Sequence, residues 1–128
     1  MSGKTSTRLM MECPSMEPGE IYLGRFPFGD IAGMKLRPVL VLSRPVGSAH
    51  EVLVAYISSV IPTESLPTDM FLDPSTERDR GTNLKSCSSL RLHKLATLHG
   101  TSLVRRLGVL SPEAAGLVAA KLRAWLSL

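Results

Sequence analysis

Polar side chains able to hold an anion stand at the ends of the apolar segments of this sequence. Arg37 lies at the start of one apolar run, and Ser58 and Ser59 follow another. Arg91 and His93 are separated by one residue, so in a strand their side chains point to the same face. Singly, each also fits an ordinary role, such as a surface ion-pair partner, a strand end or a hydrogen-bonded histidine. Their types and spacing alone therefore indicate only a candidate polyanion site.

The positive charge is concentrated in the last third of the chain. Lys and Arg number 15 against 11 Asp and Glu, for a formal net charge of +4. Between residues 85 and 106 there is no carboxylate, and the cations there are Lys85, Arg91, Lys94, Arg105 and Arg106. An uncompensated positive field attracts polyanions, of which nucleic acid is the commonest in cytoplasm, although a solvated basic face has the same composition.

Cofactor and metal chemistry have no support in the sequence. It has no glycine-rich phosphate loop, no dinucleotide-binding fingerprint, no paired-histidine metalloprotease motif and no nucleophile elbow. The histidines lack metal-ligand spacing with one another and with Cys13 and Cys87, and two cysteines cannot form a disulfide-rich scaffold. We therefore expect neither a cofactor nor a metal site.

The length of 128 residues allows one domain and excludes a (β/α)₈ barrel and most doubly wound nucleotide-binding folds. We expect a flexible N-terminal tail over residues 1–18, where Ser, Thr, Gly and Pro are frequent, and a single domain over residues 19–128. The apolar runs are too short to span a bilayer or to form a secretory signal. A cytoplasmic protein with no membrane partner is therefore expected.

Apolar runs bounded by turn residues predict a β-rich fold. The runs at 38–43 and 51–58 are almost continuously apolar, which is typical of strands buried on both faces. The other predicted strands lie at residues 20–26, 69–72, 88–92 and 104–110. Short strands of this kind indicate a small, strongly bent sheet or barrel.

A helix over residues 112–126 is predicted to close the chain. Ser111 is a favourable N-cap, and Pro112 and Glu113 are favourable in the first turn. Helical spacing gives one apolar stripe, made of Ala114, Leu117, Val118, Leu122, Trp125 and Leu126. Such a stripe is typical of a helix that faces a core.

Three blocks of the sequence, in order, resemble the MazF/PemK toxins. The first reads G-E-I-Y-L at 19–23, F-P-F-G-D at 26–30 and K-L-R-P-V-L-V-L-S at 35–43. The second is V-A-Y-I-S-S at 54–59. The third is L-R-L-H-K-L-A-T-L at 90–98, followed by V-R-R-L-G at 104–108 and L-S-P-E at 110–113. One block would be weak evidence, but three in this order cover most of the chain.

The resemblance implies a fold, an activity and partners. The fold is mainly β (α+β), an SH3-like β-barrel of short antiparallel strands with a C-terminal α-helix, assembled as a homodimer. The activity is that of the toxin of a type II toxin–antitoxin pair, an endoribonuclease or mRNA interferase. It would cleave single-stranded RNA without a metal, leaving 2′,3′-cyclic phosphate and 5′-hydroxyl ends. The cognate antitoxin is expected to be acidic and to order on the cation-rich stretch.

The family's motifs also assign site residues. The arginine of the R-P-V-L-V block falls on Arg37, and the hydroxyl residue after the second strand falls on Ser58. The R-x-D motif falls on Arg91 and His93, so a histidine stands where the family has an aspartate. These four are the expected catalytic residues, and the expected RNA-binding residues are Asp30, Lys35, Ser59, Lys85 and Lys94.

The histidine leaves two mechanisms open. His93 can serve as the acid–base group, because nearby arginines would lower its pKa and keep it neutral at pH 7. In the other mechanism it only stacks on or hydrogen-bonds to an RNA base, and Asp30 or Glu20 accepts the proton. The glutamate that some members carry five residues before the strand arginine is Ala32 here.

Two further functions fit the same resemblance. A barrel that keeps its fold, dimer and partner but cleaves inefficiently would be a binding module for RNA or antitoxin, and the histidine at position 93 motivates this alternative. Inhibition of DNA gyrase by a relative of the same fold is less favoured, because the arginine-bearing RNA blocks are present.

Overall fold

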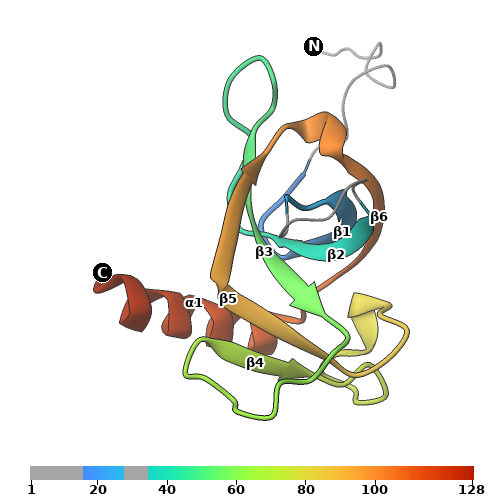
Figure 1. Cartoon of the computed structure of the whole chain (residues 1–128), viewed down its shortest axis with the longest axis vertical. Coiled ribbons are helices and arrows are strands. Elements are labelled where there is room, and N and C mark those ends of the chain that lie inside the picture. Colours follow the sequence, from blue (N-terminus) through green and yellow to red (C-terminus); the bar gives the residue numbers. More distant parts are fainter. Residues whose placement is uncertain (1–15, 28–34) are drawn as a thin grey trace.

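The computed structural model describes residues 16–27 and 35–128, which form one antiparallel sheet and one long helix (Figure 1). The sheet order is β4-β5-β3-β2-β1-β6, so β4 and β6 are its edges. Among the described strands these two edges are not paired with each other, and the predicted barrel is therefore found as a strongly curved, open sheet. The strands are β1 (Glu20–Arg25), β2 (Leu36–Val41), β3 (Val52–Ser58), β4 (Asp69–Leu72), β5 (Ser88–Leu98) and β6 (Leu103–Val109).

Strands β2 and β3 are buried on both faces, which confirms the prediction from their continuous apolar runs. Side chains alternate along a strand, so the neighbours Val39 and Leu40 enter opposite cores, and Val54 and Ala55 do the same. The core that contains Leu40 and Ala55 is covered by the helix α1 (Pro112–Leu126). The central strands thus carry both cores and hold the rest of the sheet in place.

Strand β5 is longer than predicted and contains a break in its pairing. The adjacent residues Ala55 and Tyr56 of β3 stand opposite Leu95 and Arg91, so residues 92–94 of β5 have no opposite partner. His93 and Lys94 lie in this break and interrupt the apolar pattern of the sequence. The strand was therefore predicted to end at residue 92. The other strands lie within two residues of their predicted bounds.

Edge strand β6 pairs with β1 through two irregularities. The register with β1 skips Val104 and then Leu107, each of which is an extra residue on the β6 side. Bulges of this kind bend an edge strand and change the direction of the side chains beside them. These two bulges therefore influence the directions of Arg105 and Arg106, which lie between them.

The helix α1 begins as predicted, but half of its apolar stripe is exposed. The Ser111 hydroxyl accepts a hydrogen bond from the backbone N–H of Ala114 at 3.1 Å, which confirms the N-cap. Leu117, Trp125 and Leu126 are 42%, 45% and 46% exposed. Trp125 and Leu126 are exposed because the C-terminal turns of α1 extend past the sheet (Figure 1), so the stripe faces the core only in part.

The flexible tail was predicted to end at residue 18, but the packed part of the chain begins before that residue. Met16 is 1% exposed and belongs to the core on the face opposite α1. The backbone N–H of Glu17 donates to the Glu20 carboxylate at 2.9 Å. Residues 1–15 lie outside the described part of the chain. At least the last three residues of the predicted tail are thus part of the fold.

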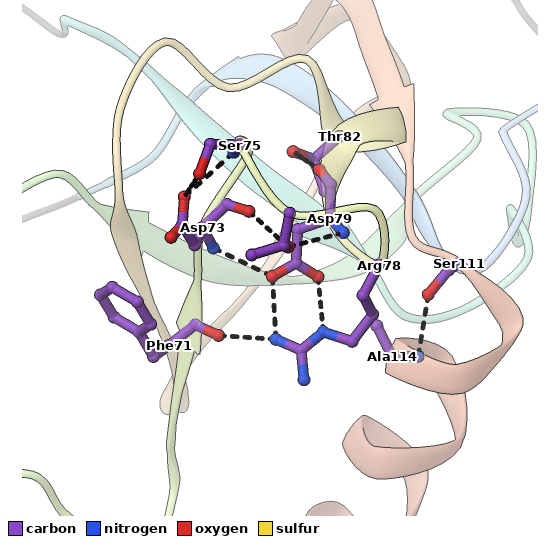
Figure 2. A network of polar contacts seen from close by, with 9 residues as sticks. Phe71, Asp73, Ser75, Arg78, Asp79, Thr82, Ser111 and Ala114 are labelled. Carbon is purple, nitrogen blue, oxygen red and sulfur yellow. Dashed lines mark hydrogen bonds and ion pairs between the residues drawn. The ribbon is translucent and has the colours of Figure 1, made fainter.

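A buried aspartate organises the loop between β4 and β5 (Figure 2). The Asp79 carboxylate accepts two hydrogen bonds from the Arg78 guanidinium, each 2.8 Å long, and one from the backbone N–H of Asp73 at 2.9 Å. Arg78 also donates to the carbonyl oxygen of Phe71 in β4 at 2.9 Å. Burial alone would raise the pKa of Asp79, but these hydrogen bonds outweigh it and hold that pKa below its usual range. The loop is therefore tied to β4.

The same loop packs directly on β6 at Gly108. It contains a short 3₁₀ helix, η2 (Arg80–Thr82), and a Cβ added at Gly108 would overlap the carbonyl oxygen of Gly81. Just beyond η2, the side-chain N–H of Asn83 donates to the carbonyl oxygen of Leu107 at 2.8 Å. This close approach fixes the segment 83–88 that leads into β5.

No helix in the described ranges, 16–27 and 35–128, is long and apolar enough to cross a membrane.

Candidate functional site

A cavity of about 680 Å³ lies where β2 begins and β3 ends. The segment 83–88 and β6 complete its walls. Three cations line it, Arg37, Lys85 and Arg105, and none of the described residues in its lining is a carboxylate. Its hydroxyl groups belong to Ser58, Ser59, Ser86 and Ser88, together with the phenol of Tyr56. Such a lining suits an anion that also accepts hydrogen bonds.

The antiparallel pairing of β2 with β3 brings Arg37 and Ser58 to one place. Val39 stands opposite Tyr56 in this antiparallel pair. Arg37, two residues before Val39, and Ser58, two residues after Tyr56, therefore lie at the same end of the sheet. The consecutive residues 36–38 all line the cavity. Because consecutive side chains alternate between faces, the cavity wraps around the start of β2.

The Ser58 hydroxyl is held by the turn that follows β3. Its oxygen accepts a hydrogen bond from the backbone N–H of Val60 at 3.0 Å, and the hydroxyl donates to the Val60 carbonyl oxygen, 3.2 Å away. A hydroxyl has one donor and two acceptor positions, so one acceptor position stays open to a ligand. The turn also places Ser59 in the cavity wall.

No described residue neutralises the cations of the cavity. Arg37, Lys85 and Arg105 form no ion pair with any residue in the part of the chain that the structure describes. By contrast, Arg106 pairs with Glu20, with 2.9 Å between Nε and the carboxylate oxygen. The cavity therefore presents its positive charge to solvent, which is the electrostatic condition for binding an anion.

Arg91 and His93 do not line this cavity. The Nε of Arg91 donates to the Asp69 carboxylate at 2.8 Å, and the other oxygen of Asp69 accepts from the backbone N–H of Leu66 at 2.9 Å. His93 Nδ1 shares a hydrogen bond of 2.9 Å with the Thr68 hydroxyl. Both side chains thus reach the chain at the start of β4. Arg91 stands opposite Tyr56, a lining residue, but is not itself part of the lining that Arg37 and Ser58 share.

The pKa of His93 is lowered, as the sequence predicted, but with a different main cause. Burial is the largest cause, the positive charge of Arg91 comes next, and Asp69 opposes them. From the sequence, nearby arginines were the expected cause of the lowered pKa. The imidazole is therefore favoured in its neutral form mainly by its position beneath the β4 segment.

The remaining predicted residues are divided between the cavity and its surroundings. Ser59 and Lys85 line it, whereas Lys35 is exposed just before β2 and Lys94 is half-buried on β5, both outside the lining. Asp30 lies outside the described residues. Sequence reasoning missed Asn83, Ser86, Ser88 and Arg105 as lining residues. The only signal for them was that Arg105 belongs to the cation-rich stretch.

The described residues contain no group of three or more His, Cys, Asp and Glu side chains placed to hold a metal ion.

The sequence matches one family along nearly its whole length. Residues 17–126 match the PemK-like, MazF-like toxins of type II toxin–antitoxin systems. The chain belongs to this family. No curated protein sequence matches the chain.

Solved structures share the fold of this family member. An endoribonuclease in complex with its cognate antitoxin, from Mycobacterial species, is 20% identical with a TM-score of 0.63, covering 87% of this chain and 94% of that one. The Mycobacterium tuberculosis toxin MazF-mt6 is 23% identical with a TM-score of 0.64, and the match covers 85% of this chain and 97% of that one. MazF from Deinococcus radiodurans is 16% identical with a TM-score of 0.63, covering 90% and 99%. At these identities the likeness is one of fold.

Proposed function

We propose that this toxin is an endoribonuclease that cleaves single-stranded RNA in the cavity between β2, β3 and β6. The observation that carries the proposal is the meeting of Arg37, Ser58 and Lys85 in a cavity whose described lining holds no carboxylate. Fixed cations beside hydroxyl groups stabilise the charge that builds on a phosphodiester during its cleavage. Membership of the PemK/MazF toxins supports the proposal.

The proposed reaction is a transesterification. The ribose 2′-hydroxyl attacks the adjacent phosphorus, the bond from phosphorus to the 5′ oxygen breaks, and the products carry a 2′,3′-cyclic phosphate and a 5′-hydroxyl. One group must take the 2′ proton and another must give a proton to the leaving oxygen. Arg37 would stabilise the phosphoryl oxygens, and Ser58 would accept a hydrogen bond from the substrate. Because guanidinium groups supply the positive charge, the reaction would proceed without a metal.

The proposed proton acceptor is Asp30. Of the two carboxylates that the sequence offered, Glu20 is already occupied, since it accepts hydrogen bonds from the backbone of Glu17 and from Arg106, both at 2.9 Å. His93 is bound to Thr68 outside the cavity lining. Asp30 lies in the segment that precedes Arg37 in the sequence.

Mapping of new 5′-hydroxyl ends tests the cleavage. Mixed single-stranded RNA is incubated with the purified protein in EDTA, and the ends are compared with those made by Arg37→Ala and Arg44→Ala. Arg44 is an exposed arginine that pairs with Glu17, so its loss controls for a change in net charge. We expect cleavage by the wild type and by Arg44→Ala, and loss with Arg37→Ala. Equal cleavage by all three proteins would remove Arg37 from the site.

A binding module is the second candidate function. The observation that favours it is that His93, which replaces the family aspartate, is bound away from the cavity, leaving a described lining with neither a carboxylate nor an imidazole. Tight RNA binding without any new ends, over varied RNAs, would support this alternative.

The proposed partners are an acidic antitoxin and a second copy of the chain. One of the similar structures is an endoribonuclease in complex with its cognate antitoxin. An acidic segment from such a partner would bind over the cations of the cavity and displace RNA. Binding should weaken as salt rises, since exposed charges are screened over about 10 Å at 0.1 M ionic strength. Binding that ignores salt and leaves cleavage unchanged would contradict this proposal.

A further inference from the structure

Two adjacent arginines of β6 have different surroundings. Arg106 stands opposite Tyr22 and its Nε donates to the Glu20 carboxylate at 2.9 Å. Arg105 stands opposite Leu23, lines the cavity and forms no ion pair with any described residue. One arginine of the pair is thus neutralised on the surface, and the other adds its charge to the cavity.

Adjacent side chains of a strand point to opposite faces, which is why the two arginines separate, and two irregularities of β6 flank the pair. The extra residues Val104 and Leu107 lie immediately before and after the arginine pair. An extra residue on one strand shifts the alternation of the side chains that follow it, so bulges are common beside functional sites, where they re-aim a side chain. Without them, the strict alternation of an edge strand would place different residues toward the cavity.

The second arginine assigned by the family motif is committed elsewhere. The side chain of Arg91 is 17% exposed and pairs with Asp69, whose side chain is 3% exposed. Turning Arg91 toward the cavity would leave the buried Asp69 carboxylate without its cation, which is costly. A second guanidinium for the cavity has to come from another strand.

We propose that Arg105 is a substrate-binding residue that holds a backbone phosphate flanking the one at Arg37, and that Arg91 serves the framework of the sheet. The inference rests on the proposed RNA-cleaving function. Arg37 stands opposite Gly24 and Arg105 opposite Leu23, on the two strands that flank β1. Strands are about 4.8 Å apart, so the two backbones are separated by about 10 Å across β1. Because the adjacent residues Leu23 and Gly24 face opposite sides of β1, the two arginines approach the cavity from different walls, from which they can hold two phosphates of one RNA strand.

The test compares Arg105→Ala with Arg106→Ala, a control that removes the same charge from the neighbouring position. Binding of a fluorescein-labelled single-stranded RNA is measured by anisotropy over a range of salt concentrations, which needs no cleavage. Loss of one phosphate contact lowers the slope of log K against log salt by about 0.7 for a single strand. We expect this change, and affinity roughly three- to tenfold weaker, for Arg105→Ala only. Arg105→Lys should restore the slope.

A chemical substitution locates the contact. In RNAs carrying one uncharged methylphosphonate at each successive position, one substitution should weaken binding to the wild type but not to Arg105→Ala. Equal salt slopes for the wild type and both alanine variants would overturn the inference. An equal loss of RNA affinity in Arg105→Ala and Arg106→Ala would also overturn it. Because Arg37→Ala is scored separately for 5′-hydroxyl ends, loss of cleavage there with no effect at Arg105 would leave the proposed function standing.

Discussion

His93 shows how burial determines the role of a polar side chain at the residue scale. Its pKa is lowered, chiefly by burial, so the folded state favours the neutral imidazole. The stability this gives is fully present above about pH 6.5 and is lost as the pH falls through the lower pKa of the folded state. We expect the difference in Tm between the wild type and His93→Ala to be constant from pH 7 to 8 and to shrink below pH 6.

The same variant separates the two mechanisms that the sequence left open. His93 bonds to Thr68 and does not line the cavity, so we expect His93→Ala to cleave RNA within about threefold of the wild-type rate, far less than the loss expected for an acid–base group. The rate is measured at several pH values on one RNA substrate. A fall of roughly 10²–10⁴-fold would instead assign His93 to proton transfer.

Asp79 is the carboxylate on which the β4–β5 loop depends. Asp79→Asn would leave Arg78 without its charged partner, and we expect the free energy of unfolding to fall by about 2–3 kcal/mol at pH 7. Since the pKa of Asp79 is lowered in the fold, its contribution is present above about pH 4 and is lost as the pH falls through the folded value. The gap between wild type and variant in urea unfolding should therefore narrow toward pH 3. Glu64→Gln, at an exposed position, should show no such gap.

At the scale of elements, the contact between η2 and β6 is the connection on which the cavity wall depends. Gly108→Ala would push Gly81 away from β6, and we expect about 1–3 kcal/mol of destabilisation together with weaker RNA binding. Gly116 of α1 is the matched control, because a Cβ there meets nothing within 4 Å. Gly116→Ala should raise the stability by up to about 1 kcal/mol, since alanine favours a helix over glycine. Thermal unfolding followed by circular dichroism compares the two.

Regular apolar patterns allowed most elements to be predicted from the sequence. The strand β4 and the helix α1 have the predicted bounds, because apolar residues, turn residues and the Ser111 cap mark their ends. The second half of β5 could not be predicted, since its pairing with β3 resumes after a stretch that has no partner on β3. The sequence predicted a barrel, whereas the described strands form an open sheet, because closure depends on the curvature of all the strands together.

The candidate site was predictable where it follows strand ends and not where it depends on distant contacts. Arg37, Ser58 and Ser59 are placed by antiparallel pairing at the ends of two apolar runs, and the sequence marks those ends. Arg105 depends on two bulges, which leave no periodic signal. The removal of Arg91 from the site depends on Asp69, a residue from another strand whose approach no local pattern reveals.

At the scale of the whole molecule, we expect a dimer. Large apolar side chains remain exposed on this chain, among them Val60, Phe71 and Trp125, at 74%, 52% and 45%. Apolar surface of this kind is often covered by a second copy related by a two-fold axis. Sedimentation equilibrium at micromolar concentration should give twice the mass of the chain. A single species of monomer mass would contradict both the dimer and any site shared between two copies.

The pairing of β1 with β6 also sets when the protein becomes active. Glu20 stands opposite Val109, far along the chain, so this ladder closes one of the longest loops in the fold. Contacts between such distant residues cost the most chain entropy and are expected to form late in folding. The cavity is lined by Arg105 from β6 and by Arg37 from the start of β2, so both strands must be in place to complete it. A nascent chain that has not yet released β6 from the ribosome therefore lacks Arg105 and part of the cavity wall, so the proposed RNA cleavage would begin only after β6 has emerged.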